Sequence, residues 1–181
     1  MTHTLHLNLW AGPGVGKSST AALVYGALKM LDVNAELVRE YVKERCWLGD
    51  TATAKNQIYV SAKQYHRQVM VDGQVDVAIT DSPILLGIIY QGRGKTPSFD
   101  QYLLELFNEF RNLNVFLVRN PEEHKYNPKG RYQTEEEAIA KDNEIFALLN
   151  RYNIPFSVVM IDREHALPKI LGMVKKELII L

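Results

Sequence analysis

The sequence predicts an α/β domain in which helices cover both faces of a parallel sheet. Strand-like and helix-like patterns alternate along the whole chain, as is typical of this fold class. The stretch AGPGVGKS, residues 11–18, matches a phosphate-binding loop and lies between the first strand pattern and the first helix pattern. A chain of 181 residues with 46% hydrophobic residues can bury one full core, so we expect a single domain over residues 1–181.

Hydrophobic periodicity predicts the elements in order. Leu5, Leu7 and Leu9 alternate with polar residues as in a strand, and apolar residues recur at helical spacing from the loop to Leu31. Short apolar runs predict strands over residues 4–11, 34–39, 75–80, 114–119 and 155–162. The other helical patterns predict helices over residues 53–71, 99–111 and 134–150, a buried helix within 81–90, and a last helix from residue 166.

Some segments carry more specific expectations. The stretch through Trp47 and Gly49 is polar and is expected to be irregular, and residues 91–98 and 120–133 are expected to be loops. Thr134 and Glu137 have the spacing of a capping box at a helix start. The inward face of the helix over residues 53–71 is expected to contain Ile58, Ala62, Tyr65 and Val69.

The loop at residues 11–18 has the residue types that hold a phosphate. Glycines let backbone N–H groups converge on phosphate oxygens, Lys17 would reach the β- and γ-phosphates, and the Ser18 hydroxyl would bind Mg²⁺. Ala11 replaces the first glycine of the usual pattern and needs only to be compact. An ordinary glycine-rich turn is the alternative, although both flanks match a phosphate loop. The expected nucleotide-binding residues are Gly12, Gly14, Val15, Gly16, Lys17, Ser18 and Ser19.

Asp81 ends the third expected strand, in the stretch VAITD. An apolar strand that ends in an aspartate beside a phosphate loop typically orients Mg²⁺, which makes Asp81 the second metal candidate after Ser18. Aspartates also cap helices, and the following Ser82-Pro83 could begin one. Asp81 could serve in both ways.

Composition excludes several other classes of protein. There are 21 basic and 21 acidic residues, so no overall charge attracts nucleic acid or a membrane. The one cysteine, Cys46, cannot form an internal disulfide, and the histidines are scattered, so a protein-held zinc is not expected. No signal peptide or long apolar run is present, and we expect a cytoplasmic protein. We expect Cys46 to be half-buried rather than a reactive thiol, and His66 to lie at the surface rather than in a binding pocket.

In layout, the chain resembles the nucleoside and nucleotide kinases among P-loop proteins. The match lies in the loop AGPGVGKS, in the acidic residues Glu40 and Asp81 beyond two strands, and in a basic segment after the fourth strand, where that group has its lid. The resemblance implies a P-loop NTPase fold with strand order 2-3-1-4-5, with ATP and Mg²⁺ as cofactors. Ligands of such sheets gather at the carboxyl ends of the strands, so these regions should share one cleft.

Glu40 is similar in its place to the glutamate that acts as general base in deoxynucleoside kinases. The resemblance implies that Glu40, or else Asp81, accepts the proton of the attacking hydroxyl. The alternative for Glu40 is a solvated helix face shared with Arg39, Lys43 and Glu44. Trp47 follows as the aromatic residue that would wall the nucleoside pocket, although aromatic residues more often fill cores.

The segment over residues 120–133 combines cations with tyrosines. Positive side chains that close over a nucleotide stabilise the transferring phosphoryl group, and we expect Arg131, then Lys129, to make this contact. A solvated basic loop is the alternative. Cations interleaved with Tyr126 and Tyr132 are also typical of proteins that hold single-stranded or flipped-out nucleotides.

A narrower resemblance is carried by AGPGVGKSS, REYVKE, TDSP and YNPKGRYQTEEEA, which look like small phage-encoded P-loop kinases. Some proteins of that kind phosphorylate 5-hydroxymethyluracil within DNA, and others resemble nicotinamide riboside kinases. The resemblance implies an ATP-dependent transfer of phosphate to a nucleoside-type hydroxyl, and in its narrower form the hydroxyl belongs to 5-hydroxymethyluracil in DNA. Alternatives are a kinase of a free nucleoside or nucleotide, an ATPase switch without an acceptor, and an inactive nucleotide-binding protein.

Overall fold

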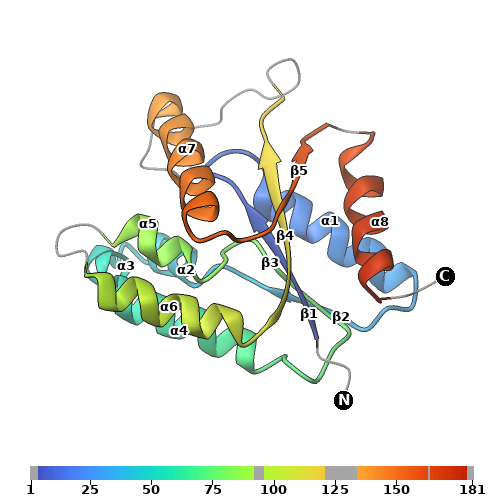
Figure 1. The fold of residues 1–181 in the computed structure, drawn as a ribbon, viewed down its shortest axis with the longest axis horizontal. Helices are drawn as coiled ribbons and strands as arrows, with labels where there is room; N and C mark the ends of the chain where they lie inside the picture. Colours follow the sequence, from blue (N-terminus) through green and yellow to red (C-terminus); the bar gives the residue numbers. More distant parts are fainter. Residues whose placement is uncertain (1–3, 92–95, 121–133, 163, 179–181) are drawn as a thin grey trace.

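The computed structural model describes residues 4–91, 96–120, 134–162 and 164–178. Its centre is a five-stranded sheet in the order β2-β3-β1-β4-β5, and all neighbouring strands are parallel (Figure 1). This arrangement confirms the predicted P-loop NTPase fold and its strand order. The strands are β1 (Leu5–Trp10), β2 (Ala35–Val38), β3 (Val77–Thr80), β4 (Arg111–Val118) and β5 (Ser157–Met160).

Helices cover both faces of the sheet (Figure 1). One face packs on α1 (Lys17–Met30) and α8 (Ala166–Leu178). The other face packs on α5 (Leu86–Tyr90), α6 (Pro97–Asn108) and α7 (Glu135–Arg151). The remaining helices are α2 (Tyr41–Trp47), α3 (Thr51–Lys55) and α4 (Gln57–Val69).

Both faces of β1 are buried, although its sequence alternates between apolar and polar residues. Leu5, Leu7 and Leu9 belong to the core under α1 and α8. On the other face, the Asn8 side chain donates to the side-chain oxygens of Asn112 and Asn114, at 2.8 and 3.1 Å. These hydrogen bonds satisfy the amide donor of Asn8 on the buried face.

The stretch that the sequence analysis expected to be irregular is instead largely the helix α2, Tyr41–Trp47. Tyr41 is buried, and its backbone N–H donates to the Gln64 side chain at 3.0 Å. This tertiary hydrogen bond satisfies one of the free N–H groups at the start of the helix. Trp47 is 74% exposed, so the expectation that it fills the core is wrong.

The expected helix over residues 53–71 is divided at Asn56 into α3 and α4. Its expected inward face is also wrong, because Ile58 is 69% exposed and Ala62 and Val69 are exposed as well. The buried face of α4 consists of Val60, Ser61, Gln64 and Gln68. Ser61 of this face packs directly against Gly87 of α5. A residue with a Cβ would not fit there, because its Cβ would collide with the serine oxygen.

Other helix and strand boundaries differ from the predicted ones by a few residues, and one predicted helix cap is confirmed. Helix α6 begins at Pro97 and ends at Asn108, so that β4 already starts at Arg111. A proline is well suited to the first turn of a helix, where its missing N–H costs nothing. Thr134 and Glu137 form the expected capping box at the start of α7.

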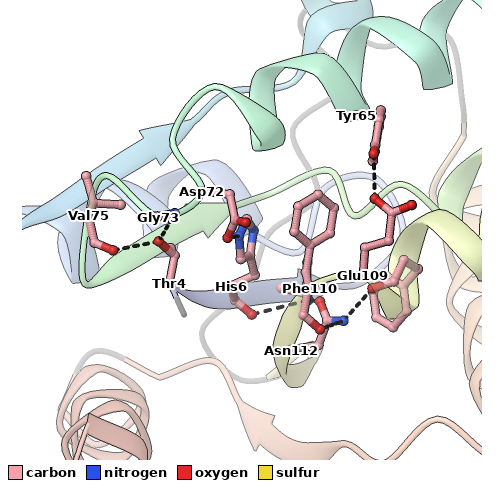
Figure 2. A network of polar contacts seen from close by, with 11 residues as sticks. Thr4, His6, Tyr65, Asp72, Gly73, Val75, Glu109, Phe110 and Asn112 are labelled. Atoms are coloured by element: carbon pink, nitrogen blue, oxygen red, sulfur yellow. Dashed lines mark hydrogen bonds and ion pairs between the residues drawn. The ribbon is translucent and has the colours of Figure 1, made fainter. Parts of the chain in front are cut away.

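A network of polar contacts lies at the end of the sheet at which β1 begins (Figure 2). His6 is buried, its Nε2 lies 3.0 Å from a carboxylate oxygen of Asp72, and its ring centroid lies 4.3 Å from that of Phe110. Burial lowers the pKa of His6, and the hydrogen bond and charge of Asp72 only partly oppose this. The network is structural, because it lies away from the phosphate loop that follows the other end of β1.

We expect His6 to make the protein less stable in mild acid. Its pKa is lower in the folded state than the ordinary value of 6.5, so its contribution to stability is full above that value and is lost as the pH falls below it. In His6→Gln the amide can still donate to Asp72 but does not titrate. The free energy of unfolding in urea, measured from pH 7.5 to 5, should fall less in this variant than in the wild type, and an equal fall would contradict the assignment.

Candidate functional site

The phosphate loop connects the end of β1 at Trp10 to the start of α1 at Lys17. Two of its glycines have left-handed backbone conformations, with φ values of 89° at Gly14 and 106° at Gly16, which residues with a Cβ rarely adopt. Gly16, which has no side chain that could form a cap, is the N-cap of α1. The loop therefore has the strand–loop–helix setting that presents backbone N–H groups to an anion.

The side chain of Lys17 folds back onto the beginning of the phosphate loop. Its Nζ donates to the carbonyl oxygens of Ala11 and Gly12, at 2.7 and 3.0 Å. These contacts hold the ammonium beside the loop, where it is available to a phosphate.

Asp81 directly follows β3 and is only 6% exposed. Its Oδ1 is buried and has no hydrogen-bond partner within the parts of the chain that the structure describes. Asp81 does not cap the next helix, since α5 begins at Leu86 with Leu85 at its N-cap position. A buried carboxylate oxygen without a partner is costly unless a ligand completes it.

Glu40 lies at the N-cap position of α2, separated from the end of β2 only by Arg39, and is half-buried. Burial is the main cause that raises its pKa, and the charge of Asp81 raises it further, whereas Lys17 and Lys43 oppose the rise. Glu40 is therefore not part of a freely solvated helix face. The charges of Lys17 and Asp81 thus both act on the Glu40 carboxyl group.

A cleft of about 300 Å³ joins these groups. Ser18, Glu40 and Asp81 line it together with Arg39, Lys43 and Trp47. The exposed indole of Trp47 thus borders the same cleft as the acidic residues that the sequence predicted. Arg39 and Lys43 add two cations to the wall of this cleft. The sequence predicted them only as charges of a solvated face.

Helix α4 holds α2 in place through residues that carry no recognisable sequence signal. The Arg67 guanidinium donates to both carboxylate oxygens of Glu44, at 2.8 and 2.9 Å, and to the carbonyl oxygen of Arg39 at 3.0 Å. Arg67 also lies over the Tyr41 ring, 5.2 Å from its centroid. These contacts fix α2, the helix whose N-cap is Glu40. His66, which lies on α4, is exposed, as expected.

Tyr90, at the end of α5, is a further titratable group near Glu40. Burial, followed by the charges of Glu40, Glu144 and Asp142, raises the pKa of Tyr90 to about 12. Its phenol therefore stays protonated at neutral pH and is a hydrogen-bond donor rather than a base.

The oxygen atoms that Ser18 and Asp81 offer fit Mg²⁺ bound to a nucleoside triphosphate. The Ser18 hydroxyl and the partnerless Asp81 oxygen line one cleft, and Mg²⁺ prefers a few carboxylate and hydroxyl oxygens combined with water and phosphate. Among residues 4–91, 96–120, 134–162 and 164–178, no cluster of three His, Cys, Asp or Glu side chains could hold a metal by itself. Lys129 and Arg131 lie outside the described residues.

Comparison with known proteins places the chain in a family. The family model described as "AAA domain" (AAA_28) matches residues 9–165. No curated protein matches the chain in sequence. The fold is similar to that of a thymidylate kinase from Ehrlichia chaffeensis, with 15% sequence identity and a TM-score of 0.63 over 97% of this chain and 98% of the other. The chain thus belongs to the AAA domain family AAA_28, and its fold is that of the P-loop nucleotide kinases.

Proposed function

We propose that the chain is an ATP- and Mg²⁺-dependent phosphotransferase that moves the γ-phosphate to a hydroxyl group of a nucleoside-type acceptor. The observation that carries the proposal is the cleft that Glu40 and Asp81 share with Ser18 of the phosphate loop, the residue that directly follows Lys17. A cation for phosphate oxygens, a carboxylate for a metal and a second carboxylate with a raised pKa are the groups that this chemistry needs.

The phosphate loop binds the triphosphate in this proposal. Backbone N–H groups from Gly14 to Ser19 and the Lys17 ammonium contact its oxygens. Gly12, whose N–H donates to Asp142, contributes by its small size. Ser18 and Asp81 hold the metal, which when bound offsets the negative charge on the transferring group.

Glu40 is the general base of the proposed reaction, because Asp81 is assigned to the metal. The acceptor oxygen attacks the γ-phosphorus, the bond to the β,γ-bridging oxygen breaks, and ADP leaves. The hydroxyl proton passes to Glu40, whose raised pKa makes it a better acceptor at neutral pH than an ordinary glutamate. Lys129 and Arg131 are proposed, from the sequence alone, to stabilise the charge on the transferring phosphoryl group.

The wall of the cleft favours an acceptor that contains a base. Trp47 presents a flat, exposed ring on which a base can stack, and Arg39 and Lys43 can contact an anion beside it. A 5-hydroxymethyluracil base within DNA is the narrower form of the proposal. A free nucleoside or nucleotide is the alternative, which the likeness in fold to a thymidylate kinase favours.

Glu40→Gln tests whether the acceptor is a hydroxyl. We expect kcat to fall about a hundredfold or more while the KM for ATP changes little, because a hydroxyl needs a base and ATP binding does not. In the wild type, kcat should fall as the pH falls through the raised pKa of Glu40, because protonated Glu40 cannot accept a proton. The variant should lack this pH dependence.

Glu36→Gln is the matched control, since Glu36 is exposed on β2, four residues earlier in the chain. It should behave as the wild type. Unchanged turnover in a folded Glu40→Gln variant would contradict a base at this position and would point to an acceptor that is already anionic, such as the phosphate of a nucleotide.

A further inference from the structure

Three residues far apart in the sequence meet at the beginning of the phosphate loop. The carboxylate of Asp142, from α7, accepts a short hydrogen bond from the backbone N–H of Gly12. Its other oxygen accepts from Arg119 Nε at 2.8 Å, and Arg119 Nη2 donates to the carbonyl oxygen of Pro13 at 2.6 Å. One ion pair thus contacts two consecutive residues of the loop.

The fit between α7 and the loop is close. A Cβ added at Gly12 would lie 2.6 Å from the carbonyl oxygen of Ala138 and 2.8 Å from the Asp142 carboxylate. Only glycine leaves room for this approach, so the backbone of α7 lies directly against the loop. The Asp142 side chain is 18% exposed and that of Arg119 is 15% exposed, so water screens their pairing only weakly.

A carboxylate beside a phosphate loop would by its charge alone weaken the binding of a phosphate. Its charge repels a bound phosphate unless a cation neutralises it, and Arg119 provides that cation. What Asp142 adds is geometry: it fixes the N–H of Gly12 and the orientation of Arg119 together. Arg119 Nη1 is buried and has no hydrogen-bond partner within the described ranges, so the guanidinium keeps unused donor capacity beside the loop.

We propose that Asp142 is a positioning residue of the nucleotide site, which sets the first turn of the phosphate loop and the direction of Arg119 for binding of the triphosphate. This inference rests on the proposed function. Asp142 need not contact the nucleotide, because it acts through Gly12, Pro13 and Arg119.

Direct binding of Mg·ATP to the whole chain, measured by calorimetry without an acceptor, tests the proposal. Asp142→Ala removes both contacts and should raise the dissociation constant about tenfold or more. Asp142→Asn keeps an oxygen that accepts from Gly12 but loses the charge, and should restore part of the affinity. With acceptor present, KM for ATP should rise by a larger factor than kcat falls, because Lys17, Glu40 and Asp81 are unchanged.

Coupling between the two side chains is a second readout. If Asp142 works by orienting Arg119, Arg119→Ala should weaken binding less in the Asp142→Ala background than in the wild type. Glu144→Ala is the matched control, because Glu144 lies two residues later on α7, where its carboxylate pairs with Lys141 at the surface. It should leave the dissociation constant unchanged.

The outcomes separate this inference from the proposed function. A wild-type chain that binds neither Mg·ATP nor ADP contradicts both. A wild-type chain that binds, with folded Asp142 variants that bind equally well even if they melt at a lower temperature, overturns only the positioning role. If Asp142→Ala does not fold, Asp142→Asn decides, and wild-type affinity in that variant overturns the proposal.

Discussion

Lys17→Ala should abolish phosphoryl transfer while the fold remains intact. The Lys17 ammonium lies beside the phosphate loop on the carbonyl oxygens of Ala11 and Gly12, where it can move to the β- and γ-phosphates. Loss of a charge that stabilises the transition state should lower kcat/KM about a hundredfold or more. Steady-state kinetics with the acceptor at saturation, together with circular dichroism of the variant, would measure the effect.

Lys29→Ala is the control for this experiment, because Lys29 lies in the last turn of the same helix and is exposed. It should keep wild-type activity. A folded Lys17→Ala variant with wild-type kcat/KM would disprove the assignment of the loop.

Asp81→Asn should impair the use of Mg²⁺ far more than folding. The variant keeps the shape of the side chain but removes the charge that a metal requires, and the Mg²⁺ concentration for half-maximal rate should rise while kcat falls about a hundredfold. Stability should change little, or rise, because a neutral amide replaces a buried carboxylate whose Oδ1 has no hydrogen-bond partner among the described residues. Kinetics over a Mg²⁺ titration and urea unfolding would separate the two effects.

Asp76→Asn serves as the control, since Asp76 is exposed just before β3, at the opposite end of the strand that Asp81 follows. It should leave the Mg²⁺ titration unchanged. An Asp81→Asn variant that loses thermal stability but keeps the wild-type Mg²⁺ response would show that the carboxylate is structural.

The parts of the site that the sequence predicted are those with local causes. The phosphate loop depends on contiguous residues, and its glycines at 14 and 16 adopt the backbone conformations that only glycine adopts easily. Asp81 follows its strand directly, so the hydrophobic pattern of β3 was enough to place it. The capping box at Thr134 is likewise formed within one helical turn.

Other parts depend on contacts between distant segments, which periodicity does not reveal. The inward face of α4 is set by the hydrogen bond from Tyr41 to Gln64 and by the close contact with Gly87, rather than by its most apolar stripe. Asp142 lies 130 residues from the glycine that it contacts, among other charged residues of α7. Trp47 ends a helix that the sequence did not predict, so periodicity could not decide between a place in the core and the exposed place at the cleft.

The central claim is that phosphate passes from ATP to a nucleoside-type hydroxyl. ATP labelled at the γ-phosphate would be incubated with the chain and Mg²⁺, without acceptor and with nucleosides, nucleotides and DNA that contains 5-hydroxymethyluracil. We expect slow release of phosphate without acceptor and rapid transfer of label to one class of acceptor. Equal hydrolysis of ATP with and without every acceptor, as expected of an ATPase switch, would contradict it.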